Sequence, residues 1–306
     1  QGIKNDGTLW VWGENNYGMG LNDRTNRSSP TQVGTDTTWS STYPYVWFKT
    51  DGTMWTDGYN AVGRLGQNDT IARSSPVQIP GTTWTTNISA GNQHQIAIKT
   101  DGTLWGWGDQ SDRGQLGQNQ QGPGTAYSSP MQIGTGTDWS KVWNGTGGGY
   151  GSHAIKTDGT LWVWGNNFGA LGLNQSNGSR SSPAQLPGTT WKQTSMMNGA
   201  NAVLAVKTDG TLWCWGTGNS DYGLLGLNDT VNYSSPMQVG TDTNWSEPLS
   251  DTGGSAGALK TDDTLWVWGD QPYGALGLNN NIKYSSPVQL PGKWKNTAGG
   301  GADGIV

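Results

Sequence analysis

The sequence is poor in the residues from which most domain cores are built. Of its 306 residues 32 % are hydrophobic, and Phe occurs only twice. A helical bundle needs Leu and Ala on a periodic face, so this composition disfavours one. No run of 18 apolar residues is present, which excludes a transmembrane helix and predicts that the chain does not insert into a membrane.

Basic residues and cysteine are also scarce. The 17 Lys and Arg residues stand against 22 Asp and Glu, giving a net charge of −5. Binding to a phosphate backbone needs a dense basic patch, so we expect no nucleic-acid partner. The single cysteine, Cys214, permits no intramolecular disulfide. It stands where sister segments have Val163 and Val267, so we expect a small core side chain there.

The abundant residues are Trp, with 19, and Gly, with 50, and an internal repeat accounts for much of both. The segment Asp-Gly-Thr-Leu/Met-Trp recurs at intervals of 45, 50, 57 and 51 residues, and a variant with Asp-Asp follows after 53. Each copy is followed by Ser-Ser-Pro and then by a lone Trp. The repeats begin near Asp6, Asp51, Asp101, Asp158, Asp209 and Asp262. Six copies of about 51 residues therefore organise the chain, and 17 of its 19 Trp residues fall at repeat positions.

Each repeat is predicted to form short strands. In one copy, apolar runs at 153–156 and 161–164 flank Asp158-Gly159, a pair typical of a type I′ hairpin turn with positive φ at both positions. The second run is apolar on both faces and must be covered on both, as in the stacked sheets of a β-propeller. We therefore predict an all-β propeller. Its structural tryptophans are Trp10, Trp12, Trp105, Trp107, Trp162, Trp164, Trp213, Trp215, Trp266 and Trp268.

The repeat also resembles a known family. Segments such as HAIKTDGTLWVWGNNFGALGLN, followed by SSPAQL, resemble the repeat of the regulator of chromosome condensation family, especially in its bacterial and phage relatives. The resemblance covers essentially the whole chain. It implies a β-propeller with four-stranded blades, usually seven of them. It implies little about function, because the family includes a nucleotide-exchange factor, protein inhibitors of β-lactamase and uncharacterised surface proteins.

Six copies predict one propeller domain over residues 1–306, with six blades, or seven if one repeat is missing from the chain. The run 301–306 resembles the start of the hairpin strand that residues 2–4 would finish, which favours closure with six blades. Copies 1 and 2 are the least regular: the Gly18-Met19-Gly20 loop is one residue short, and Asp57 stands where a second Trp is expected.

No group of residues outside the repeat points to catalysis, a cofactor or a metal. His94 and His153 are interpreted as occupying the same repeat position, where they would hydrogen-bond the backbone at the start of a strand. The repeated Asp of the Asp-Gly pairs is explained by turn chemistry. We therefore predict no catalytic residue, no metal ligand and no cofactor.

The loop after each Trp-Gly varies most between copies and supplies the candidate binding residues. Variable polar loops that carry aromatic residues suit recognition of a protein or a glycan; alternatively, each ring is a local lid over the following glycine. The candidates are Tyr17, Asp109, Arg113, Phe168, Tyr222 and Tyr273.

Two kinds of function follow from these observations. The first is a non-catalytic interaction or structural module at a cell surface, outside the cell or on a virion, of an adhesion or tail type, alone or as part of a larger assembly. An acidic pI and a composition rich in Asn, Gly, Thr and Ser favour it. The alternative is an intracellular protein-binding regulator of the exchange-factor or inhibitor type.

Overall fold

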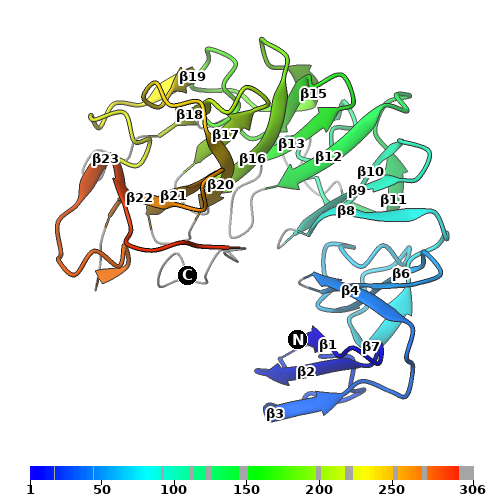
Figure 1. Cartoon of the computed structure of the whole chain (residues 1–306). Coiled ribbons are helices and arrows are strands. Elements are labelled where there is room, and N and C mark those ends of the chain that lie inside the picture. Colours follow the sequence, from blue (N-terminus) through cyan, green and yellow to red (C-terminus); the bar gives the residue numbers. More distant parts are fainter. Residues whose placement is uncertain are drawn as a thin grey trace. The chain divides into compact units, whose positions relative to one another are not determined.

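The structure is a computed structural model of the 306-residue chain. It describes residues 1–16, 18–43, 45–90, 93–110, 113–120, 126–144, 151–167, 169–197, 201–217, 223–250, 254–270 and 274–295. Over these ranges the chain forms antiparallel β-sheets and no α-helix (Figure 1). No helix in the described part of the chain has the length and hydrophobicity needed to cross a bilayer. The all-β prediction is therefore confirmed.

The described residues form six sheets, here called blades 1 to 6, in two compact units. The first unit comprises residues 1–112 and 121–142, and it holds blades 1 to 3. The strands of blade 1 are β1 (Gly2–Ile3), β2 (Leu9–Gly13) and β3 (Arg27–Gln32). Blade 2 has β4 (Trp39–Tyr43), β5 (Val46–Lys49), β6 (Met54–Gly58) and β7 (Arg73–Gln78). Blade 3 has β8 (Trp84–Ala90), β9 (His94–Lys99), β10 (Leu104–Asp109) and β11 (Ala126–Gln132).

The second unit comprises residues 113–120 and 143–306. The strands of blade 4 are β12 (Trp139–Asn144), β13 (Gly151–Lys156), β14 (Leu161–Gly165) and β15 (Arg180–Gln185). Residues 139–142 of β12 belong to the first unit and the rest of the blade to the second. Blade 5 has β16 (Trp191–Met197), β17 (Ala202–Lys207), β18 (Leu212–Gly216) and β19 (Tyr233–Gln238). Blade 6 has β20 (Trp245–Ser250), β21 (Ser255–Lys260), β22 (Leu265–Gly269) and β23 (Tyr284–Gln289). The terminal run 301–306, on which six-bladed closure was predicted, lies outside the described residues.

The hairpin turn within each blade differs from the predicted type I′. In blade 4 the Gly159 N–H donates to the Lys156 carbonyl at 3.0 Å, and the Lys156 N–H donates to the Thr160 carbonyl at 3.0 Å. Gly159 has φ +78°, whereas Asp158 is not among the residues with positive φ. The turn is therefore a three-residue loop with glycine at the left-handed position, and the type I′ prediction was wrong.

The repeated Asp, Thr and Trp side chains form one chain of hydrogen bonds. Asp158 accepts from the N–H of Thr160 at 2.9 Å and from its Oγ1 at 2.7 Å, and Thr160 Oγ1 accepts from Trp162 Nε1 at 3.0 Å. The ammonium group of Lys156 lies 4.9 Å from the Trp162 ring centroid, a cation–π contact. The same arrangement recurs in the sister blades, so the turn sequence serves the scaffold, as predicted for its aspartates.

In repeats 3 to 6 the second Trp donates a hydrogen bond to the repeat before its own. The antiparallel register shifts at this residue, and such a bulge redirects the side chain. The indole Nε1 of Trp107, Trp164, Trp215 and Trp268 donates to the carbonyls of Arg64, Gln115, Ala170 and Leu224 respectively, at 2.8–2.9 Å. All four side chains are 0 % exposed. Each indole is therefore buried and satisfies a buried carbonyl of the preceding repeat.

Glycine and asparagine in the Gly-x-Leu-Gly-x-Asn loop allow neighbouring blades to approach closely. A Cβ on Gly172 would lie 3.0 Å from both Leu186 Cδ1 and Trp215 Nε1. Asn174, in the left-handed region at φ +58°, donates its N–H to the carbonyl of Ser234 in the next blade at 2.8 Å. The first serine of Ser-Ser-Pro is therefore the acceptor in a contact between blades.

Hydrophobic cores lie mainly between successive blades. Within the second unit, Leu204 and Cys214 of blade 5 pack with Ala256 and Trp268 of blade 6 in one buried cluster. Because the cores are shared by adjacent sheets, stability depends on nearest-neighbour contacts, as in other repeat proteins.

The Gly172→Ala variant is expected to lower the free energy of unfolding by about 2–4 kcal/mol. A residue with a Cβ is strained at φ +69°, and the added carbon also crowds Trp215 and Leu186. The matched control is Gly240→Ala: this glycine has φ +61° and nothing within 4 Å of its Cβ position, so only about 1 kcal/mol is expected. Chemical denaturation measures both, and equal losses would contradict a role for close packing at Gly172.

Candidate protein-binding surface

Two connections of every four-stranded blade lie at the same end of its sheet. The Asp-Gly turn joins the second and third strands, so antiparallel order places the other two connections at the opposite end. Backbone hydrogen bonds join the start of the connection between the third and fourth strands to the connection between the first and second strands. The Asp109 N–H donates to the Gln93 carbonyl at 2.9 Å, and in blade 6 the Asp270 N–H donates to the Gly254 carbonyl at 3.0 Å. The variable loops are thus anchored on the scaffold.

Only two of the six predicted binding residues lie in the described part of the chain. Tyr17, Phe168, Tyr222 and Tyr273 lie outside the described residues. Asp109 ends β10, and Asp109 and Arg113 are both half-buried and engaged in contacts within the protein. Neither is a free surface charge, and a role in binding stays a prediction for all six residues.

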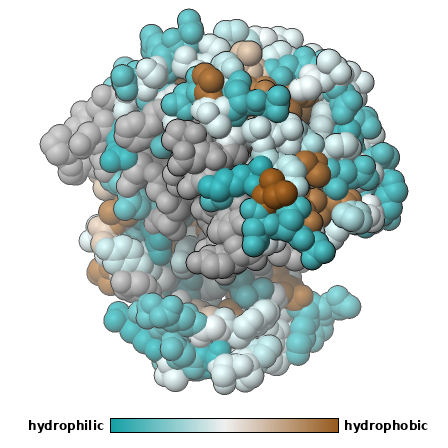
Figure 2. Space-filling model, turned by 90° about the vertical axis from the view of Figure 1, so that its left-hand side faces the viewer, coloured by the Kyte–Doolittle hydropathy of each residue, from teal (hydrophilic) through white to brown (hydrophobic). Residues whose placement is uncertain are grey.

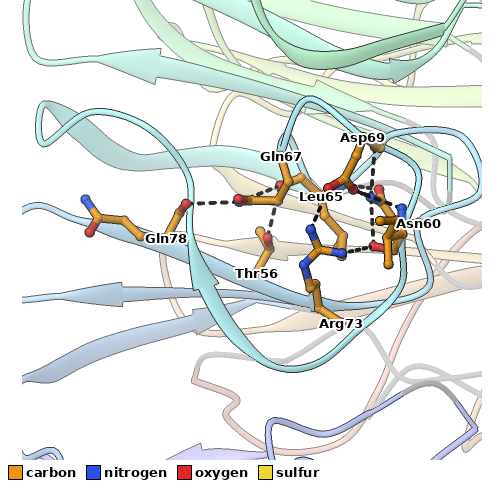
Figure 3. Close-up of polar contacts among 8 residues, drawn as sticks. Thr56, Asn60, Leu65, Gln67, Asp69, Arg73 and Gln78 are labelled. Atoms are coloured by element: carbon orange, nitrogen blue, oxygen red, sulfur yellow. Dashed lines mark hydrogen bonds and ion pairs between the residues drawn. The ribbon is translucent and has the colours of Figure 1, made fainter.

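The loop that returns to the last strand of blade 2 is held by a dense network of hydrogen bonds (Figure 3). Asn60 Nδ2 donates to the carbonyls of Asp69 at 3.0 Å and Ile71 at 3.1 Å, while its Oδ1 accepts the Leu65 N–H at 2.9 Å. Arg73 forms an ion pair with Asp69, in which Nη2 donates to Oδ2 at 2.5 Å. These contacts fix the loop backbone before any partner binds.

The same loop carries an exposed aliphatic side chain in three blades. Ile71, Val231 and Ile282 occupy one register, two residues before the Arg or Tyr that precedes Ser-Ser-Pro. Their side chains are 64 %, 53 % and 59 % exposed. The face shown in Figure 2 is mostly hydrophilic or pale, with hydrophobic residues in small separate groups. These residues were not predicted from the sequence, although an aliphatic residue at one register of a polar loop was a visible signal.

The two tryptophans of each Trp-x-Trp pair lie in different environments. The first Trp of each pair is half-buried beside its turn. The second is fully buried in blades 3 to 6, and Trp12 differs, with 46 % exposure. Trp12 belongs to the first blade of its unit, and no earlier blade of that unit covers it.

The two histidines do not share a repeat position, which corrects the sequence interpretation. His94 pairs with Gly108 across the hairpin, whereas His153 pairs with Val163, the equivalent of Gly106, which pairs with Ile96. His153 therefore stands where blade 3 has an aliphatic residue. It stacks on Trp215 with ring centroids 6.2 Å apart, and neither ring nitrogen makes a well-formed hydrogen bond among the described residues. Its role is therefore to pack in the core rather than to bond the start of its strand.

Burial dominates the titration of both histidines. It lowers the pKa of His94 to about 4 and that of His153 to about 3, because a charged imidazolium is poorly solvated in the core. The nearby backbone of Ala170 favours the charged form of His153 but does not offset its desolvation. Both side chains are therefore neutral at pH 7. Within the described residues, no three His, Cys, Asp or Glu side chains gather as a metal site would require.

Cys214 and Asp57 are two further buried titratable groups among the described residues. Cys214 is 0 % exposed within the core between blades 5 and 6, as predicted, and burial raises the pKa of its thiol. Asp57 is 2 % exposed in β6 at the position of the second Trp. Burial also raises the pKa of its carboxyl group well above the ordinary value.

Family models identify the repeat. The model described as the regulator of chromosome condensation (RCC1) repeat matches residues 51–98 and 209–247, and a second RCC1-repeat model matches residues 86–115. The chain is 26 % identical over 250 residues to the human E3 ubiquitin-protein ligase HERC2, covering 79 % of this chain and 5 % of HERC2. It is 26 % identical over 292 residues to the Arabidopsis thaliana ultraviolet-B receptor UVR8, covering 91 % of this chain and 64 % of UVR8. The chain thus spans less than two thirds of either relative.

Solved structures show the same fold. Human WBSCR16 matches with a TM-score of 0.71 and 19 % identity, over 96 % of this chain and 79 % of that one. Prp20p from Saccharomyces cerevisiae matches with a TM-score of 0.71 and 17 % identity, over 99 % and 78 %. The repeated four-stranded sheets define a β-propeller protein. Residues 51–115 and 209–247 match regulator of chromosome condensation repeats, and the chain as a whole is similar to proteins built from that repeat.

Proposed function

We propose that this chain is a non-catalytic protein-binding propeller of the regulatory kind. The observation that carries the proposal is the repeated exposure of Ile71, Val231 and Ile282 on loops whose backbones are already fixed by hydrogen bonds. Exposed aliphatic residues on rigid loops suit a protein partner, because little loop entropy is lost on binding.

Relatives support this proposal by analogy. Prp20p has binding properties toward Gsp1p and histones, and yeast RCC1 (Prp20) has been solved with Kap60 bound to it. Because the sequence identity is low, these complexes suggest a kind of partner and name none for this chain. An extracellular, adhesion or virion function, a glycan partner and the site of action in or outside a cell stay predictions from the sequence.

The proposal is tested by a paired variant in the second unit. The Val231→Ser/Ile282→Ser variant is expected to weaken a stoichiometric protein complex at least tenfold, because two exposed aliphatic contacts are lost while the loop hydrogen bonds remain. The complex is isolated by crosslinking and mass spectrometry and then measured by titration calorimetry with the purified partner.

Met237→Ser is the matched control, since Met237 is an exposed hydrophobic residue, 39 % exposed, that lies on strand β19 rather than on the loop. Full affinity is expected for this control. Recovery of a specific glycan on an array, with no stoichiometric protein partner, would favour the adhesion-type function instead.

A further inference from the structure

Asp57 interrupts the packing rule that the other blades follow. In blades 3 to 6 the equivalent residue is a buried Trp, such as Trp107, whose Nε1 donates to a carbonyl of the preceding blade at 2.9 Å. Gly66 lies beside that indole: a Cβ placed on this glycine would be 3.1 Å from the indole Nε1. In blade 1 the corresponding Gly20 has Val33 and Pro76 as its nearest neighbours and no indole. Because residue 57 is Asp where the sister blades have Trp, no large aromatic side chain fills this position between blades 1 and 2.

A cavity of about 320 Å³ lies at this place, within the first unit. We call it the Asp57 pocket. It is lined by Gln1, Val11, Glu14, Gly18, Met19, Tyr45, Trp47 and Asp57. Its volume is at the lower end of the range of small-molecule sites. The Trp47 indole nitrogen already donates to Gln1 Oε1 at 3.0 Å, so this residue offers mainly its apolar ring to an occupant.

The pocket combines these apolar and aromatic walls with an incompletely satisfied acid. Asp57 is 2 % exposed, and its Oδ2 has no hydrogen-bond partner among the described residues. The Gly20 backbone N–H and the more distant charge of Arg64 favour the ionised carboxylate but do not offset its desolvation. The Arg64 guanidinium lies over the Tyr45 ring at 4.5 Å, and its Nε donates to the Tyr59 carbonyl at 2.6 Å.

A second carboxylate strengthens the preference for a positive ligand. Glu14 also lines the pocket, and it is exposed. The Tyr45 ring already carries the Arg64 guanidinium, so the aromatic face left to an occupant is that of Trp47. Two acidic groups beside the Trp47 ring form a site that suits an organic cation, because a cation is attracted both to carboxylates and to aromatic faces.

We propose that the Asp57 pocket binds a primary ammonium group carried on an apolar stem. The charge of the bound ammonium group keeps the Asp57 carboxyl group ionised against its desolvation, and the ammonium group donates to Asp57 Oδ2. The stem packs against Val11, Met19 and the Trp47 ring. This chemistry is shared by small free amines and by the lysine side chain of a protein. None of the residues that line the pocket lies in the loop between β6 and β7, which carries Ile71. Failure of amine binding and failure of the proposed protein-binding function are therefore distinguishable.

The pocket is tested by calorimetric titration with 2-phenylethylamine, with 2-phenylethanol as the uncharged analogue and phenylacetate as the anionic one. Only the amine is expected to bind measurably. Nα-acetyl-lysine methylamide represents the protein source, and whichever amine binds more tightly identifies the source. Equal binding of the amine and the alcohol, or no binding of either amine, would overturn the proposal.

Two variants place the binding at Asp57. Asp57→Asn preserves the shape of the side chain and is expected to weaken amine binding at least tenfold. Asp57→Trp introduces the residue of the sister blades into the cavity and is expected to abolish binding while raising the melting temperature. Circular dichroism verifies that both variants are folded. Wild-type affinity in Asp57→Asn would exclude the carboxylate as the ligand.

Discussion

Replacing Trp268 by alanine is expected to lower the free energy of unfolding of the second unit by about 3–5 kcal/mol. The indole is 0 % exposed in the core that blades 5 and 6 share, and its removal leaves a cavity between them. It also leaves the Leu224 carbonyl, which accepts from Nε1 at 2.8 Å, without its donor. A typical domain is stable by only about 5–15 kcal/mol, so a loss of this size is readily measured by urea denaturation.

Two further variants separate the parts of this effect. Trp268→Phe retains much of the ring but not the N–H, so a loss of about 1–3 kcal/mol is expected from the unsatisfied carbonyl and the smaller volume. Trp266→Ala, two residues earlier, removes a half-buried ring that donates to Thr264 Oγ1 within its own blade. It should cost clearly less than Trp268→Ala. Equal losses for the two alanine variants would contradict the assignment of the second Trp as the joint between blades.

Acid is expected to destabilise each unit through its buried histidine. Folding lowers the pKa of His94 to about 4 and of His153 to about 3, from an ordinary value of 6.5. Below pH 6.5 the unfolded chain therefore binds protons that the folded chain does not, and stability falls as the pH falls. Below pH 6.5 the slope is about 1.4 kcal/mol per pH unit for each histidine. Between pH 8 and pH 5 the free energy of unfolding of each of the two compact units therefore falls by about 2 kcal/mol. Urea denaturation across that range measures it.

The His153→Leu variant is the test of this assignment. Leu204 occupies the same register in blade 5, so the repeat already accommodates leucine at that position. The variant is expected to remove the loss of stability of the second unit between pH 8 and pH 5 and to leave that of the first unit, which contains His94, unchanged. An unaltered pH dependence of the second unit in His153→Leu would rule out His153 as the titrating group.

The two hairpin strands of each repeat could be predicted from the sequence, because their apolar runs flank an Asp-Gly or Asp-Asp pair. The turn type could not be predicted from that pair alone. Asp-Gly suits both a two-residue turn and a three-residue loop, and the choice depends on which backbone groups pair, as the bond from Gly159 to Lys156 shows. The repeat position of His153 was likewise misjudged because strand register is a property of pairing rather than of composition.

The Asp57 position illustrates the same limit for the candidate site. The sequence marked it as an exception among the second Trp residues but gave no consequence for packing. Only the spatial arrangement brings Val11, Met19 and Trp47 around the carboxyl group, since these residues come from two blades.

By itself, the sequence determined the all-β class, the six repeats of about 51 residues and the scaffold role of nearly all Trp residues, because those features are local and recur at fixed spacing. The tertiary structure decided which side chains are satisfied and which are exposed. It buries Trp268, exposes Trp12 and Ile282, and leaves Asp57 and His153 with unpartnered polar atoms among the described residues. The physical reason is that burial and hydrogen bonding depend on what an adjacent blade supplies, and no single repeat contains that information.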